Sequence, residues 1–131
     1  MSHNDEQRSA AMREGGQRLA RVLQSVIEAV RPGVTTGELD AIAEAGIRAA
    51  GGTPSFKGYN GYPASLCTSV NAAVVHGIPR ADWELHEGDI VGLDIGMVYD
   101  GAYTDMAFSV GVGAISEQAQ QLLKITRESL R

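Results

Sequence analysis

Two aspartates, Asp94 and Asp105, lie on either side of an Asp100-Gly101 pair. An Asp-Gly pair between two apolar stretches favours the two-residue turn of a β-hairpin. That turn places Gly96 opposite Asp105, and it places Asp94 two residues away on the same face of the pleat. The two carboxylates are then diagonal neighbours about 7 to 8 Å apart at the backbone, close enough for their side chains to converge.

Converging carboxylates repel each other, and each raises the pKa of the other unless a cation lies between them. A divalent metal is the simplest such cation, and oxygen ligands suit Mn²⁺, Fe²⁺, Co²⁺ or Mg²⁺. Small residues leave an open floor around the pair: Gly92, Gly96, Ala107 and Ser109. Spacing alone also allows a second interpretation, in which both aspartates lie on a solvated sheet face and have no function.

A histidine in an apolar stretch, His76 of Val75–Pro79, is the second chemical feature. Its imidazole would hydrogen-bond a substrate amide or a tetrahedral intermediate, or it would be an ordinary strand-end histidine. Tyr59 and Tyr62 lie in a tight turn that would wall a small pocket or form a surface loop. Cys67 alternates within an apolar strand, as a small buried hydrophobe does.

Helical spacing of apolar residues predicts a first helix over residues 9–30. Thr35 and Glu38 match a capping box, which predicts a second helix that ends at Gly51. A third helical pattern covers residues 115–130. These helices flank a middle region with the texture of strands and turns.

Four strands are predicted, over residues 65–71, 73–77, 89–99 and 102–112. The order helix, helix, four strands, helix favours an α+β fold, in which helices cover one face of an antiparallel sheet. The face opposite Asp94 is predicted to pack under the helices as the core, through Val91, Leu93, Ile95, Met97, Met106, Phe108 and Val110.

The composition is that of one ordinary globular domain, with 131 residues, 44% of them hydrophobic and 21% charged. The net charge of −5 and the lack of a basic cluster argue against nucleic acid and anionic membranes as partners. One cysteine excludes an internal disulfide and favours the cytoplasm. Residues 1–8 are predicted as a flexible leader and residues 9–131 as the domain.

Five short motifs, taken in order, resemble those of bacterial-type methionine aminopeptidase. They are Tyr59-Asn60-Gly61-Tyr62-Pro63, Ser65-Leu66-Cys67-Thr68-Ser69-Val70-Asn71, Val75-His76-Gly77-Ile78-Pro79, Gly88-Asp89-Ile90-Val91, and Asp94 with Asp105. The resemblance covers nearly the whole chain from about Ser9. It implies the first half of a pita-bread fold, and a cytosolic hydrolase that removes the initiator methionine from new polypeptides whose second residue is small.

The resemblance also implies a role for each matching residue. Asp94 and Asp105 match the two aspartates of a dinuclear metal site, and His76 matches a histidine that contacts the substrate and helps to stabilise the tetrahedral intermediate. The metals of such a site would activate water and polarise the scissile carbonyl. Three further residues match positions that line the pocket for the methionine side chain: Tyr59, Tyr62 and Cys67.

The family's other metal ligands, a histidine and two glutamates, match no residue of this chain. Two carboxylates alone make a weak site, so the isolated monomer is predicted to bind Mn, Fe or Co weakly and to have little or no activity. A second half-domain would complete the site. The alternative is a non-catalytic half-domain that forms a symmetric homodimer and shares a four-aspartate centre between its chains.

Overall fold

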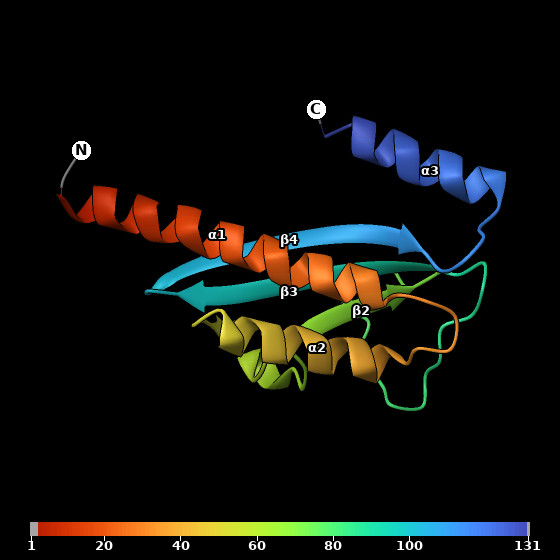
Figure 1. Ribbon diagram of the computed structural model, residues 1–131, viewed down its shortest axis with the longest axis horizontal. Helices are drawn as coiled ribbons and strands as arrows, with labels where there is room; N and C mark the ends of the chain where they lie inside the picture. The colour runs from red at the N-terminus through yellow and green to blue at the C-terminus, as the bar shows by residue number, and fades with distance from the viewer. Residues whose placement is uncertain (1–2, 131) are drawn as a thin grey trace.

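Two long helices pack against one face of a four-stranded antiparallel sheet (Figure 1). The structure is a computed structural model and describes residues 3–130. Its elements in chain order are α1 (His3–Ala29), α2 (Thr36–Ala49), β1 (Thr53–Pro54), the 3₁₀ turn η1 (Tyr59–Gly61), β2 (Leu66–Val70), β3 (Ile90–Tyr99), β4 (Ala102–Gly111) and α3 (Glu117–Glu128). The predicted α+β class, with helices on one face of an antiparallel sheet, is confirmed.

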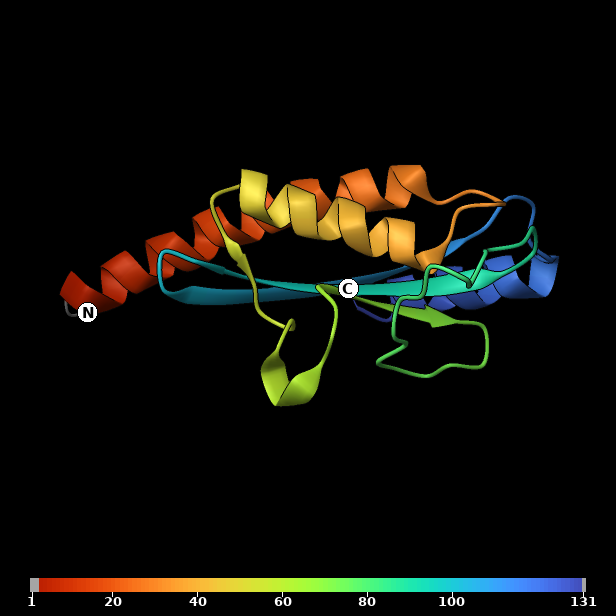
Figure 2. The ribbon, with the colours of Figure 1, turned by 90° about the horizontal axis from the view of Figure 1, so that it is seen from below.

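Strand β3 is the centre of the sheet. It pairs with β4 along its whole length, so β1 and β2 share its other edge. The hairpin register is the one predicted from the Asp-Gly turn, with Gly96 opposite Asp105 and Tyr99 opposite Ala102. Figure 2 shows α1 and α2 on one side of this sheet and the segment that contains η1 on the other.

The two helix starts differ in how well the sequence predicts them. The Thr35 side chain accepts a hydrogen bond from the Glu38 amide at 3.1 Å, and the Glu38 carboxylate accepts one from the Thr35 amide at 2.8 Å, which confirms the capping box. In contrast, α1 already begins at His3, so residues 3–8 of the predicted leader are helical. Acidic residues in its first turn, Asp5 and Glu6, favour a helix start here.

The predicted strand over residues 73–77 is wrong. These residues belong to a loop over residues 71–80 (the 71–80 loop), in which the Val74 side chain is 90% exposed. Asn71 and His76 have φ angles of 51° and 57°, which turn the chain out of an extended path. The two-residue strand β1 was not predicted, because it is short and half of it is proline.

The core lies between the helices and the sheet. Its fully buried side chains include Leu19, Val26, Leu39, Ile47, Val91, Leu93, Ile95 and Met97. The predicted core face of β3 is therefore confirmed. On β4, Met106 and Val110 are partly buried, but Phe108 is 36% exposed. The guanidinium of Arg127 on α3 lies 4.7 Å from the Phe108 ring and covers it only in part. No helix within residues 3–130 has the length and the apolar character needed to cross a bilayer.

Candidate active site

A cavity of about 650 Å³ lies on the sheet face opposite α1 and α2. Its lining residues are Phe56, Tyr59, Asn60, Gly61, Tyr62, Pro63, Cys67, His76, Ile78, Asp94 and Asp105. All six residues singled out from the sequence are among them. Residues 56–63 (the 56–63 wall) form one side of this cavity, and the β3–β4 hairpin forms its floor.

The two aspartates on the cavity floor interact electrostatically. Asp94 is half-buried and Asp105 is exposed. Burial raises the pKa of Asp94, and the charge of Asp105 and a side-chain hydrogen bond with it raise that pKa further. His76, on the 71–80 loop, lowers the same pKa of Asp94 by a smaller amount.

The predicted open floor is covered at Gly96. This glycine is buried, and a Cβ atom placed there would overlap the Ser55 hydroxyl and the Phe56 ring. A glycine at this point of β3 therefore lets Phe56 lie directly against the sheet. Phe56 was not predicted as a site residue, because a glycine in β3 indicates a close approach to the strand but not which residue makes it.

Tyr62 connects the wall to the rest of the cavity. Its hydroxyl donates a hydrogen bond to the Leu66 carbonyl at 2.9 Å and lies 3.4 Å from the Gly77 carbonyl. Burial is the main reason that the pKa of Tyr62 is raised. Burial also raises the pKa of the neighbouring Cys67 thiol, and the negative charge of Asp94 adds to that effect. Both side chains therefore stay neutral at pH 7 and present apolar surface to the cavity.

His76 is exposed and sits in the left-handed region, so the backbone around it must be fixed by other contacts. The Gly77 amide donates to the Ser69 hydroxyl at 3.2 Å, and the Gly77 carbonyl accepts from the Thr68 amide at 2.7 Å. These contacts attach the 71–80 loop to β2. The imidazole is thereby held at the rim of the cavity that contains the two aspartates.

The carboxylate oxygens on the cavity floor are suitable ligands for a divalent cation, but they are only part of a usual ligand set. Two carboxylates offer hard oxygen ligands, and a cation between Asp94 and Asp105 would relieve the like-charge repulsion that raises the pKa of Asp94. Within residues 3–130, no group of three or more His, Cys, Asp or Glu side chains has the arrangement to hold an ion. This part of the chain therefore offers two protein ligands rather than a full set.

In EDTA, the Asp94→Asn substitution should raise the free energy of unfolding at pH 7. Because the folded-state pKa of Asp94 lies above its ordinary value of 3.8, the stability it contributes is complete below pH 3.8 and is lost as the pH rises through the folded pKa. Urea unfolding between pH 4 and pH 8 measures this. The variant should lose less stability than the wild type over that range, and Asp100→Asn at the exposed hairpin turn should behave like the wild type.

Comparisons with known proteins agree with the motifs. A family model described as Metallopeptidase family M24 matches residues 10–131. Methionine aminopeptidase of Clostridium perfringens is 52% identical over 118 residues, which are 90% of this chain and 47% of that protein. Methionine aminopeptidase 1 of Mycobacterium tuberculosis is 48% identical over 129 residues, which cover 95% of this chain and 48% of that protein.

A solved structure of methionine aminopeptidase from Thermotoga maritima matches with a TM-score of 0.90 at 36% identity, and the match covers 93% of this chain and 49% of that one. The chain thus spans about half the length of the relatives it matches. The predicted resemblance to methionine aminopeptidases is confirmed, and so is the half pita-bread architecture.

Proposed function

Because this chain belongs to metallopeptidase family M24, we propose that its cavity is half of a methionine aminopeptidase active site. The observation that carries this proposal is the convergence of all six motif residues on one cavity. They come from three separate parts of the chain: the 56–63 wall with β2, the 71–80 loop, and the β3–β4 hairpin. The substrate would be a peptide whose first residue is methionine.

Each group has a role in this proposal. Asp94 and Asp105 hold a divalent ion such as Mn²⁺, Fe²⁺ or Co²⁺, which when bound supplies Lewis acidity to a peptide carbonyl. The His76 imidazole, at the cavity rim, donates a hydrogen bond to the substrate or to the tetrahedral intermediate. The remaining groups bind the thioether side chain, which favours apolar and aromatic neighbours: Tyr59, Tyr62 and Cys67, together with Phe56.

The incomplete set of metal ligands also determines how much peptidase activity we expect. Two carboxylates without further protein ligands bind a divalent ion weakly, and within residues 3–130 no third His, Cys, Asp or Glu side chain joins them in a metal-binding arrangement. We therefore expect the isolated monomer to have little or no peptidase activity. A second half-domain would supply the other ligands. A cytoplasmic location stays a prediction from the single cysteine.

Peptide binding tests the proposal without requiring turnover. In ¹H–¹⁵N NMR spectra recorded with Mg²⁺, the peptide Met-Ala-Ser should shift the amide signals of the 56–63 wall and Cys67. Asp-Ala-Ser should leave them in place, because an acidic first side chain meets the negative floor and an apolar wall. Equal shifts with both peptides, or shifts confined to residues outside the cavity, would contradict the proposed pocket.

A turnover assay tests the expected weak activity separately from the assignment of the pocket. Release of methionine from the same peptide with Mn²⁺ should be close to background for a species shown to be monomeric by sedimentation. Robust turnover by that monomer would overturn the expectation of an incomplete centre, whereas it would leave the assignment of the pocket intact.

The open edge of β4 supports a second candidate, a non-catalytic half-domain that pairs with itself. Within residues 3–130, β4 pairs only with β3, and its other edge carries no strand. Large apolar side chains near it are exposed, with Tyr103 at 70% and Leu122 at 60%. A symmetric dimer would cover such an edge. Sedimentation equilibrium should then show two-chain species, and a strictly monomeric chain at high concentration would exclude this candidate.

A further inference from the structure

The 56–63 wall has little regular structure of its own. Its only element is the 3₁₀ turn η1, and Gly58, Asn60 and Gly61 all have positive φ angles. Its internal backbone hydrogen bonds, such as Gly58 to the Tyr62 carbonyl at 2.7 Å, close the turn on itself. They do not fix the turn relative to the sheet. The position of the wall over the cavity depends on contacts with the sheet and on what holds its two ends. On the sheet side, the Phe56 ring lies on Gly96, the Ser55 amide donates a hydrogen bond to the Gly96 carbonyl at 3.2 Å, and the Tyr62 hydroxyl donates one to the Leu66 carbonyl.

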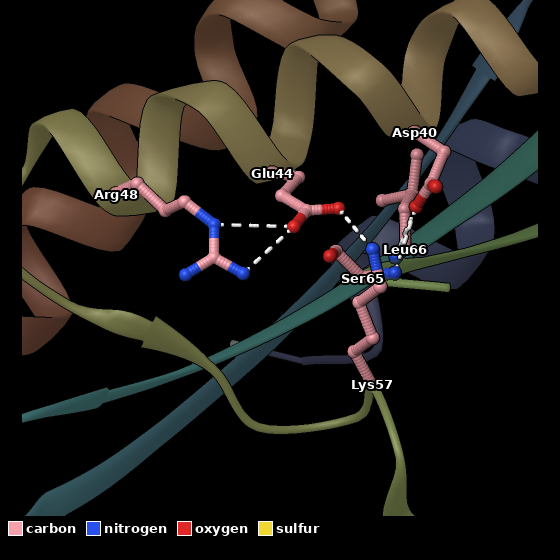
Figure 3. A network of polar contacts seen from close by, with 6 residues as sticks. All are labelled: Asp40, Glu44, Arg48, Lys57, Ser65 and Leu66. Atoms are coloured by element: carbon pink, nitrogen blue, oxygen red, sulfur yellow. Dashed lines mark hydrogen bonds and ion pairs between the residues drawn. The ribbon is translucent and has the colours of Figure 1, made fainter. Parts of the chain in front are cut away.

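Asp40 on α2 holds the end of the wall that leads into β2 (Figure 3). A single carboxylate oxygen, Oδ1, accepts hydrogen bonds from the Ser65 amide at 2.8 Å and from the Leu66 amide at 2.9 Å. Ser65 and Leu66 are fully buried, so both amides would lack a partner without this carboxylate. Hydrogen bonds to a charged acceptor are the stronger kind. Asp40 itself does not line the cavity.

Glu44 contacts the other end of the wall, which the Ser55 amide also attaches to β3 through the Gly96 carbonyl. Its carboxylate binds the Lys57 ammonium at 2.6 Å and the Arg48 guanidinium at 2.8 Å (Figure 3). Lys57 directly follows Phe56, the ring that lies on Gly96 of the floor. These side chains are partly exposed, so this contact is the weaker of the two. The spacing of four residues puts both carboxylates on one face of α2.

We propose that Asp40, assisted by Glu44, is a positioning residue that sets the distance between the 56–63 wall and the sheet. In this proposal α2 contributes to the site without touching the substrate, because its two carboxylates hold both ends of the segment that carries Phe56, Tyr59 and Tyr62. The importance of this for methionine binding rests on the proposed function. The attachment itself does not, since it concerns only contacts within the chain.

Cys67 reports on the attachment. It is the single cysteine of the chain, it is buried, and it lies beneath the wall one residue after Leu66. When the wall lifts, the thiol becomes accessible to the reagent 5,5′-dithiobis(2-nitrobenzoic acid). Asp40→Ala should speed this labelling roughly 10-fold or more, because two buried amides lose a charged acceptor. Asp40→Asn keeps an acceptor oxygen and should stay within about 3-fold of the wild type.

Ser65→Ala is the matched control. The Ser65 hydroxyl is buried and has no hydrogen-bond partner among the described residues, whereas the amide of the same residue binds Asp40. Removing the hydroxyl leaves the attachment intact, so the labelling rate should not change. Labelling of Asp40→Ala at the wild-type rate, or an equal increase in Ser65→Ala, would overturn the proposal.

The urea dependence of labelling separates local lifting from general destabilisation. Local lifting exposes little surface, so labelling of Asp40→Ala should vary little with urea below the unfolding transition. A purely structural role predicts the opposite. Labelling would then rise with urea as steeply as global unfolding does, and its increase would match the loss of global stability. That result would overturn the proposal.

Glu44→Lys provides a second test. Because the Glu44 side chain is partly exposed on α2, this substitution leaves the buried core unchanged. It places a positive charge against Lys57 and Arg48, which should repel the wall and speed labelling about 3-fold. Glu28→Lys on α1 makes the same charge change away from the wall and should have no effect. If Asp40→Ala fails to fold, an unchanged rate in Glu44→Lys still overturns the proposal. None of these measurements uses a metal or a peptide, so their outcome is independent of the peptide-binding test.

Discussion

Replacing Asp94 and Asp105 together by asparagine should weaken Mn²⁺ binding by more than about 100-fold. This loss exceeds the roughly 10- to 100-fold loss of affinity that follows when a residue hydrogen-bonded to a metal ligand is replaced. The two carboxylates are diagonal neighbours on the β3–β4 hairpin and supply all the anionic oxygens on the cavity floor. Asparagine keeps the size of each side chain and removes its charge. Native mass spectrometry with increasing Mn²⁺ measures the metal count and the chain count of each species together.

A control with the same change of net charge is Asp82→Asn combined with Asp100→Asn. Both residues are exposed, and neither lines the cavity of the site. This variant should bind Mn²⁺ like the wild type. Equal loss in both double variants would show that general surface charge, and not the floor pair, attracts the ion. Metal carried only by two-chain species would favour a centre shared between chains over an incomplete centre in a monomer.

Gly77→Ala should lower the free energy of unfolding by about 3 kcal/mol, the upper end of the usual range for overpacked sites. A Cβ atom at Gly77 would overlap the Thr68 carbonyl oxygen and lie 2.9 Å from the Ser69 Cα. Both are backbone atoms of β2, which is paired to β3. The substitution therefore forces the 71–80 loop, and His76 with it, away from the cavity. Urea unfolding followed by circular dichroism measures the loss.

Gly16→Ala is the contrasting glycine substitution. Gly16 lies within α1, and a Cβ atom there would meet nothing within 4 Å. Alanine should raise stability here by about 0.5 to 1 kcal/mol, because it is the better helix former. A Gly77→Ala variant as stable as the wild type, with unchanged NMR shifts for the 71–80 loop, would show that β2 and the loop separate more easily than their backbone contacts indicate.

The hairpin was predictable because its determinants are local. The Asp100-Gly101 turn adopts the two positive φ angles, 46° and 74°, that such turns require, and the alternation along β3 then fixes which side chains face the helices. An apolar, β-branched stretch misled at residues 73–77, which lie in an exposed loop. Local pattern carries no information on whether a neighbouring strand is present to pair with.

The residues of the site also divide into those that the sequence predicts and those that it does not. Its six motif residues were singled out from residue types and spacing, and the resemblance supplied their roles. The structure brings them to one cavity, and their chemical roles stay predictions. Phe56 and Asp40 were missed because each acts across a long sequence separation. Phe56 lies on Gly96, and Asp40 binds amides 25 and 26 residues further along the chain. Contacts of this kind have no periodic signature in a single sequence.

Strand β3 carries core and site on alternate residues: Leu93 and Ile95 are fully buried under the helices, and Asp94 between them faces the cavity. Under the proposed function, a mutation that disturbs this strand is therefore expected to affect folding and metal binding at once. The 56–63 wall is different, since it supplies no side chain to the buried core cluster and is attached by contacts with α2, with β2 and with Gly96 of β3. Under the proposed function, substitutions in the wall are therefore expected to change which first residue of a peptide is accepted, whereas substitutions in β3 are expected to disturb folding.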